Sequence, residues 1–192
     1  MIEKIRSIVT ENIAVQTALL NDETLLAAII KVVGQVVAVF NKNGKVLFCG
    51  NGGSAADAQH LAAELSGRFY LDRKPLFAEA LHVNSSFLTA VANDYGYDAV
   101  FARAVEAMGR PGDMLFALST SGNSTNILRA AYAAKEREML VVGMTGKSGG
   151  KLESICDFQL KIPTEKTPRV QEGHILVGHI ICELAEAALF NP

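Results

Sequence analysis

The sequence predicts an α/β fold, a three-layer sandwich whose central, mostly parallel sheet of five strands lies between layers of helices. Short apolar runs bounded by turn-forming residues, such as 46–49 and 114–118, alternate with longer segments of helical periodicity. No two of these strands are joined by a tight hairpin turn, and such alternation is typical of parallel sheets covered by helices. We expect one domain over residues 1–192, in which an α/β core in 44–192 follows two helices in 1–43.

The N-terminal segment predicts two helices. Residues 1–20 place isoleucines and valines at roughly helical spacing, which indicates an amphipathic helix. Residues 24–42 are apolar nearly all round, so we expect this helix to be buried on more than one side, as at a subunit interface. Asn43-Gly44 then ends it. We therefore expect these helices to take part in oligomerisation.

The strand at 46–49 leads into the turn Gly50-Asn51-Gly52-Gly53-Ser54, and a helix at 55–65 follows with Ser54 as its N-cap. A glycine-rich turn into the start of a helix directs backbone N–H groups at an anion, so this loop suggests a phosphate or sugar site. Many such turns bind nothing, which is the simpler interpretation. The loop lacks the G-x-G-x-x-G and Walker A patterns, so dinucleotide and P-loop folds are disfavoured.

His60 and Glu64 stand four residues apart on one face of that helix. A pair of this kind beside an anion site suggests acid–base or metal chemistry on a phosphorylated molecule, although a surface ion pair is the common alternative.

The middle of the chain continues the alternation. We expect a strand at 77–81, a helix at 85–92, a turn at 93–96, a helix at 98–108 capped by Asp98, and a strand at 114–118.

The loop Ser119-Thr120-Ser121-Gly122-Asn123-Ser124 repeats the design of the first loop, because a buried strand precedes it and a helix at 125–138 follows. Four hydroxyl-bearing residues at a helix N-terminus suit phosphate oxygens, whereas an ordinary serine-rich turn needs only one of them as a cap. Ligands in parallel α/β folds bind beyond the carboxyl ends of the strands. Both loops emerge there, so we expect them to converge on one ligand.

The last part of the chain completes the sheet and closes the fold. We expect a strand at 139–145, a loop at 146–150, a short helix at 152–156, a strand at 158–162 and a closing helix at 170–190 that carries His174 and His179.

The composition excludes several classes of protein. The formal net charge of the 192 residues is −2, which gives no reason to expect nucleic-acid or anionic-membrane binding. The three cysteines have no metal-finger spacing and suit a reducing cytoplasm. The N-terminus lacks a signal-peptide pattern, and we interpret the apolar segment 25–40 as a buried helix and not a membrane span.

Four motifs together resemble one family. Cys-Gly-Asn-Gly-Gly-Ser at 49–54, Ala-Asn-Asp at 92–94, Ser-Thr-Ser-Gly-Asn-Ser at 119–124 and Arg-Val-Gln-Glu at 169–172 are similar to those of sugar isomerase (SIS) folds, and more narrowly of the phosphoheptose (sedoheptulose 7-phosphate) isomerase family. The resemblance covers essentially the whole chain. It implies conversion of sedoheptulose 7-phosphate to D-glycero-D-manno-heptose 7-phosphate, the first step towards the activated heptoses of lipopolysaccharide or capsule, by a zinc-binding cytoplasmic homotetramer with active sites between subunits.

The resemblance also implies the functional residues. The metal ligands would be His60, Glu64, Gln171 and His179, and Glu64 and His179 would transfer the protons. The substrate would contact Asn51, Gly52, Gly53, Ser54, Glu64, Asn93, Asp94, Ser119, Thr120, Ser121, Ser124 and Gln171. An aldose–ketose isomerisation through an enediol needs at least one carboxylate and one group that titrates near neutrality, which Glu64 and His179 provide.

Two features complicate this assignment. Many members of the family have aspartate where this chain has Pro168, so the contact made by that carboxylate is missing or supplied otherwise. Gln171 and His179 are eight residues apart, about 12 Å along a regular helix, and one ion cannot easily hold both. Either the helix is irregular at Gln171 or the ligands come from different subunits.

Two alternatives to the isomerase stay open. Related SIS-fold proteins act as non-catalytic regulators, including one that assists replication initiation, although such relatives tend to lack the carboxylate and the histidine. The second alternative is an isomerase of another sugar phosphate, or a lyase, which Pro168 keeps open.

The remaining basic groups have simpler interpretations. His82 follows a strand and is predicted to be structural, and His174 is predicted to be a helix-face residue. Arg68, Lys147 and Arg169 are interpreted as surface charges, with phosphate neutralisation as the alternative.

Overall fold

The computed structural model describes residues 1–190 of the chain. The helices are α1 (Ile2–Leu20), α2 (Glu23–Asn41), α3 (Gly53–Ser66), α4 (Ser85–Tyr95), α5 (Val100–Met108), α6 (Thr125–Glu136) and α7 (Thr167–Phe190), with 3₁₀ turns at Tyr97–Ala99 and Gly150–Ser154. The strands are β1 (Val46–Cys49), β2 (Ala78–Ala80), β3 (Met114–Leu118), β4 (Leu140–Thr145) and β5 (Phe158–Lys161).

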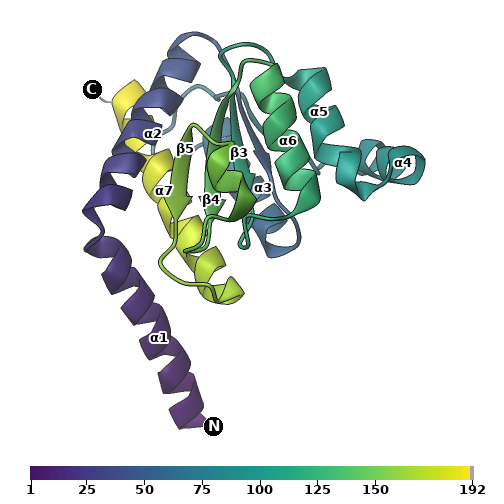
Figure 1. Ribbon diagram of the computed structural model, residues 1–192. Coiled ribbons are helices and arrows are strands. Elements are labelled where there is room, and N and C mark those ends of the chain that lie inside the picture. Colours follow the sequence, from purple (N-terminus) through teal and green to yellow (C-terminus); the bar gives the residue numbers. More distant parts are fainter. Residues whose placement is uncertain (191–192) are drawn as a thin grey trace.

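The five strands form one sheet in the order β2-β1-β3-β4-β5, and its four strand pairs are all parallel within residues 1–190. Helices cover both faces (Figure 1). Successive side chains of a strand point to opposite faces, and β1 shows this directly: Val46 and Phe48 join one buried cluster while Leu47 and Cys49 join another. The predicted three-layer α/β fold is confirmed.

The two faces differ in what covers them. The first cluster packs α2, α3 and α7 on the sheet, together with the C-terminal end of α1. The second packs α5 and α6, with Val91 of α4. By length and composition alone α2 and α7 would also suit a membrane span, yet both contribute buried side chains to the first cluster, as core helices do.

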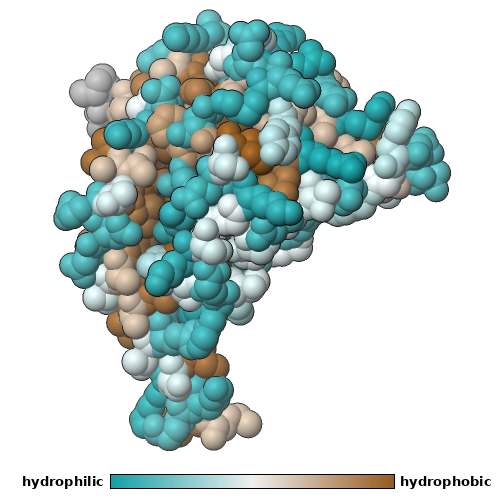
Figure 2. All heavy atoms as spheres, viewed as in Figure 1, coloured by the Kyte–Doolittle hydropathy of each residue, from teal (hydrophilic) through white to brown (hydrophobic). Residues whose placement is uncertain are grey.

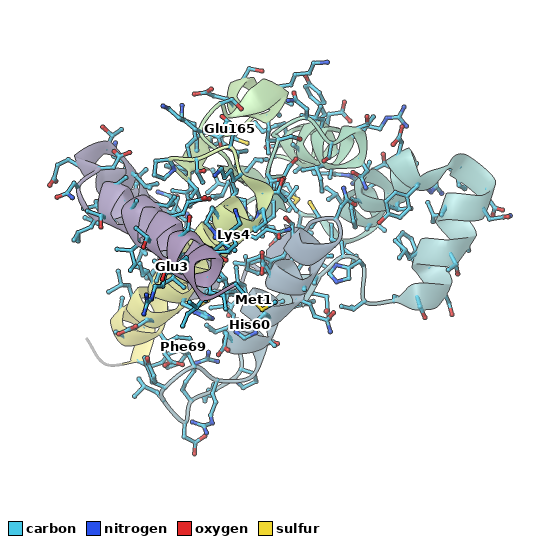
Figure 3. The ribbon with its side chains drawn as sticks, turned by 90° about the horizontal axis from the view of Figure 1, so that it is seen from below. Met1, Glu3, Lys4, His60, Phe69 and Glu165 are labelled. Carbon is cyan, nitrogen blue, oxygen red and sulfur yellow. The ribbon has the colours of Figure 1, made fainter. Side chains whose placement is uncertain are left out.

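α1 and α4 stand out from this body. In Figure 1 most of α1 projects beyond the sheet, and Figure 3, seen from below, shows its first residues, Met1, Glu3 and Lys4, in front of the body. α4 projects on the other side of the molecule, beyond α5 and α6 (Figure 1). The two projecting helices therefore keep surface that is not packed against the sheet.

Three predicted α-helix starts are wrong by at least two residues. α3 begins at Gly53 instead of residue 55, because Gly52 has φ +55° and serves as N-cap in place of Ser54. Asp98 caps no helix, since it lies inside the 3₁₀ turn Tyr97–Ala99. α7 begins at Thr167 and includes Pro168, which is compatible with a first turn because N–H groups there have no acceptor within the helix.

Two predicted helix ends are also wrong. α4 continues through Asn93 and Asp94 to Tyr95, where Gly96, at φ +82°, ends it. α6 ends at Glu136, two residues before the predicted end.

Candidate active site

The two small-residue loops leave neighbouring strands at the same edge of the sheet. β1 pairs with β3 in parallel, from Val46 and Met114 to Cys49 and Ala117, so the loops that follow start side by side. The strand order also reverses at this pair, and open α/β sheets bind ligands at such a crossing point. The two loops therefore lie side by side at one edge of the sheet, while their convergence on one ligand stays a prediction.

The first loop is tight. The N–H groups of Ser54 and Ala55 donate at 3.0 Å to the carbonyl oxygens of Asn51 and Gly52, respectively. Gly52 and Gly53 are exposed, whereas Ser54 is buried. A Cβ atom on Gly53 would lie 2.4 Å from Nε2 of Gln171, so the end of this side chain of α7 lies directly against the loop.

The second loop presents hydroxyl groups that the helix does not use. Ser124 is the N-cap of α6 but makes no side-chain cap bond within residues 1–190; its Oγ instead accepts from Oγ of Ser119 at 3.1 Å. Gly122, at φ +64°, passes so close to Gly149 that a Cβ atom would lie 2.0 Å from the Gly149 carbonyl oxygen. The loop after β4 therefore packs directly against the second loop.

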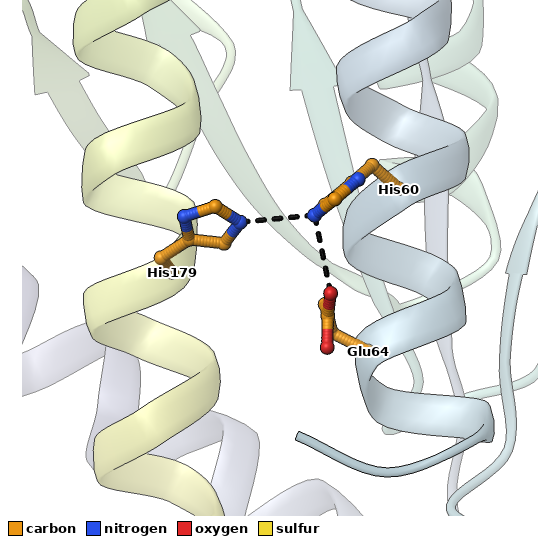
Figure 4. A group of neighbouring side chains, drawn as sticks. All are labelled: His60, Glu64 and His179. Carbon is orange, nitrogen blue, oxygen red and sulfur yellow. Dashed lines mark hydrogen bonds and ion pairs between the residues drawn. The ribbon is translucent and has the colours of Figure 1, made fainter. Parts of the chain in front are cut away.

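His60, Glu64 and His179 form a compact cluster between α3 and α7 (Figure 4). Nε2 of His60 lies 3.1 Å from Oε1 of Glu64 and 3.0 Å from Nε2 of His179. The side chain of His60 is 51% exposed and that of Glu64 24%, so solvent and small molecules reach the group. In Figure 3, seen from below, His60 lies between the two helices.

The cluster fits a metal ion. One ligand atom from each residue lies within 4.8 Å of the others, and two imidazoles with a carboxylate are a donor set that zinc uses in catalytic sites. Ligand nitrogens of a tetrahedral zinc site are roughly 3.3 Å apart, close to the spacing of the two Nε2 atoms. His60 and Glu64 are neighbours because they lie four residues apart on one helix. His179 joins them only because α7 packs on α3.

Parallel packing of α3 and α7 creates that approach. Gln171 faces Gly53 near the start of α3, and Gly178 faces Leu61 one residue beyond His60. A Cβ atom on Gly178 would lie 2.5 Å from the methyl carbons of Leu61. The helices therefore come close at the level of His60 and His179.

A buried ion pair anchors the loop after α3. Nε of Arg73 donates to Oε1 of Glu186 at 2.9 Å, and both side chains are 3% exposed. Arg73 also donates to the carbonyl oxygen of Glu64 at 2.8 Å, while Phe69 of this loop packs its ring 5.8 Å from that of His179. Arg73 and Glu186 are 113 positions apart, and their support of the cluster was not predicted from the sequence.

Asp57 lies one helical turn before His60. It is half-buried, and its Oδ2 atom has no hydrogen-bond partner among the described residues. Burial raises the pKa of this carboxyl to about 6, although His60 acts in the opposite direction. The sequence carried no signal for this residue beyond its position on the same helix.

Gln171 lies apart from the cluster within one chain. It contacts Gly53, and α7 is one continuous helix from Thr167 to Phe190, so about 12 Å along its axis separate Gln171 from His179. An irregular helix at Gln171 is thereby excluded, which leaves ligands from different subunits as the alternative.

Asn93 and Asp94 also lie apart from the cluster. They are exposed on the last turn of α4, and Nδ2 of Asn93 donates to Oδ1 of Asp94 at 2.8 Å. The helix that carries them projects from the body (Figure 1).

Two further interpretations need correction. His174 is fully buried and does not lie on an open helix face. Arg169 is largely buried: its side chain is 11% exposed, and it donates to Glu172 and, at 3.2 Å, to the carbonyl oxygen of Ile8. Arg169 therefore links α7 to α1. His82 is half-buried, and burial lowers the pKa of its imidazole, which suits the structural role predicted for it.

Known proteins resemble the whole chain. The SIS domain family matches residues 13–146. Phosphoheptose isomerase from Mycobacterium tuberculosis is 56% identical over 185 residues, which are 96% of this chain and 94% of the relative. The solved phosphoheptose isomerases from Neisseria gonorrhoeae (TM-score 0.91, 40% identity, 96% of this chain and 98% of that one) and Francisella tularensis (TM-score 0.92, 37% identity, 96% and 97%) have the same fold. The chain therefore belongs to the phosphoheptose isomerase family of SIS-domain proteins.

Proposed function

We propose that the protein is an aldose–ketose isomerase that converts sedoheptulose 7-phosphate to D-glycero-D-manno-heptose 7-phosphate, in the cytoplasm, as the first step towards activated heptoses of a surface polysaccharide. The observation that carries this proposal is the cluster of His60, Glu64 and His179 between α3 and α7. The glycine loop leads into α3, the helix that carries His60 and Glu64, and the hydroxyl loop follows the neighbouring strand β3. Relatives named as phosphoheptose isomerases align over nearly the whole chain.

In the proposed mechanism the loops hold the phosphate and orient the reacting carbons. The hydroxyl groups of 119–124 and the backbone of the glycine loop 50–53 bind the charged end of the sugar, which supports orientation of the other end. Ser54, Gly52, Gly53 and Asn51 are the proposed contacts of the first loop, and Ser119, Thr120, Ser121 and Ser124 those of the second.

Proton transfer is proposed for Glu64 and His179. Glu64 removes the proton next to the carbonyl group, and His179 moves protons between the two oxygens of the enediol. Each positioned acid or base contributes on the order of 10²–10⁴ in rate. A zinc ion held by His60, Glu64 and His179 would stabilise negative charge on the enediol oxygens.

We also propose a homotetramer with active sites between subunits. α1 projects with an exposed apolar surface made of Ile2, Ile5, Ile8, Val9 and Ile13, which are 43–62% exposed. Figure 2 shows apolar surface along the side of the molecule formed by α1, α2 and α7. In such an assembly Gln171, Asn93 and Asp94 would complete the site of another subunit, which accounts for their distance from the cluster in one chain.

The test is conversion of sedoheptulose 7-phosphate by the purified protein, by Glu64→Gln and by His179→Ala. Both variants are expected to lose at least about 10²-fold in kcat. Full activity in both would remove the proposed mechanism. A panel of pentose, hexose and heptose phosphates, with and without added zinc, separates this reaction from an isomerase of another sugar phosphate, the alternative that Pro168 supports.

A further inference from the structure

A reciprocal pair of amides joins the two loops. Nδ2 of Asn51, in the loop after β1, donates to Oδ1 of Asn126 at 2.8 Å. Asn126, in the first turn of α6, donates from its own Nδ2 to Oδ1 of Asn51 at 2.9 Å. Asn126 is 3% exposed, so water cannot replace its partner without disturbing the packing. The pair is a direct side-chain link between segments 75 positions apart.

The amide oxygens of this pair are saturated. Oδ1 of Asn51 also accepts from the hydroxyl group of Tyr97 at 3.3 Å. Oδ1 of Asn126 also accepts from the N–H group of Ile127 at 3.0 Å. Because an amide oxygen has two lone pairs, neither is left for a ligand. The side chain of Asn51 can therefore meet a sugar phosphate only through its second N–H bond.

The second loop is also held from its other side. The N–H group of Gly146 donates to the carbonyl oxygen of Thr120 at 2.9 Å, and that of Leu152 donates to the carbonyl oxygen of Gly122 at 3.0 Å. These bonds fix the loop after β3 to the segment that follows β4. The amide pair then links this loop to the loop after β1, beyond the point where β1 and β3 pair.

We propose that Asn126 and Tyr97 are positioning residues that hold Asn51, and with it the glycine loop 50–53, in register with the hydroxyl loop 119–124. The proposal rests on the proposed function for the identity of the phosphorylated substrate. A dedicated side-chain link suits a site in which two separate loops must contact one ligand, since small errors in position are costly to binding and orientation. Asn51 accordingly acts mainly through its pairing with Asn126.

A double-mutant cycle tests this. Asn51→Ala, Asn126→Ala and the double variant are compared for the Kd of inorganic phosphate by calorimetry and for KM and kcat with sedoheptulose 7-phosphate. Each single variant is expected to raise Kd and KM about tenfold, because each leaves its partner amide unpaired. The double variant is expected to be no worse than either single variant. Effects that multiply to about a hundredfold would mean that the two residues act independently, and would overturn the proposal.

Tyr97→Phe is the milder variant, since it keeps the ring and removes only the exposed hydroxyl group. It is expected to raise KM about threefold in the wild-type background and to have no effect in Asn51→Ala. The same effect in both backgrounds would contradict the proposal. Asn41→Ala, which removes the exposed amide of the last residue of α2, is the matched control and should leave KM and kcat unchanged.

The split between KM and kcat separates positioning from stability. A merely structural role would lower the folded fraction, and with it the apparent kcat, at unchanged KM. If the wild-type protein converts no heptose phosphate but the phosphate Kd shows the coupling, the proposed function fails while the positioning role stands. If the wild-type protein binds neither phosphate nor heptose phosphate, the positioning role is wrong.

Discussion

Glu186→Gln is expected to weaken the fold next to the candidate active site. The carboxylate of Glu186 accepts from the backbone N–H groups of residues 69–71 at 2.7–3.0 Å and from Arg73 at 2.9 Å. Burial raises the pKa of Glu186, but the three N–H groups and Arg73 outweigh this and hold the pKa below its usual value. The folded state therefore favours the charged carboxylate.

The size of the effect follows from the burial of the pair. Removing the charge of one partner in a buried ion pair costs about 3–5 kcal/mol, and glutamine keeps one oxygen acceptor, so we expect about 3 kcal/mol. For a chain of this length each kcal/mol corresponds to about 2–4 °C in Tm. Glu186→Gln should thus lower Tm by about 6–12 °C at pH 7.

Scanning calorimetry at several pH values measures this. Because the folded-state pKa of Glu186 is depressed, its contribution is present above the unfolded pKa and is lost as pH falls through the folded pKa. The Tm difference from the wild-type protein should therefore shrink in acid. Glu183→Gln, an exposed glutamate on the same helix, is the matched control and should shift Tm little. A loss of less than about 2 °C for Glu186→Gln at pH 7 would refute the reasoning.

Three further predictions follow from the helices α3 and α7. Burial lowers the pKa of His174 to about 4, so the unfolded chain binds a proton that the folded chain does not between about pH 6.5 and 4. The free energy of unfolding should fall by about 3 kcal/mol as the pH is lowered from about 6.5 to 4. His174→Leu should remove this part of the pH dependence in urea titrations. Gly178→Ala should cost about 1–3 kcal/mol by urea denaturation, since Leu61 must move; an unchanged midpoint would show that the helices do not need their close approach. His60→Ala and His179→Ala should each lower zinc retained after dialysis at least about tenfold by elemental analysis, whereas full retention would place the metal elsewhere.

Local patterns in the sequence predicted much of the fold. Apolar runs such as Met114–Leu118, with segments of helical periodicity between them, predicted the parallel sheet, because a strand buried on both faces is a continuous apolar run that is visible within one segment. The pairing of His60 with Glu64 was visible for the same reason, as both lie on one helix. The element ends were less accurate where a glycine or proline allowed a helix to begin earlier, as at Gly52 and Pro168.

Contacts between distant segments were not visible. His179 reaches His60 only because Gly178 lets α7 approach α3, and no local pattern gives that distance. The pairing of Asn51 with Asn126 likewise depends on β1 and β3 being neighbours, so in the sequence Asn126 is only a polar residue in the first turn of a helix. Family resemblance named His179, whereas nothing named Asn126.

Gly122 and Gly149 meet backbone to backbone, and a Cβ atom on Gly150 would lie 2.4 Å from the carbonyl oxygen of Ser121. Backbone atoms therefore make most of this contact behind the second loop, so few side-chain rotamers have to be fixed there when an anion binds. Affinity at this place should be hard to improve by substitution. Changes in sugar preference are more easily accommodated on α4, whose exposed last turn has room for new side chains.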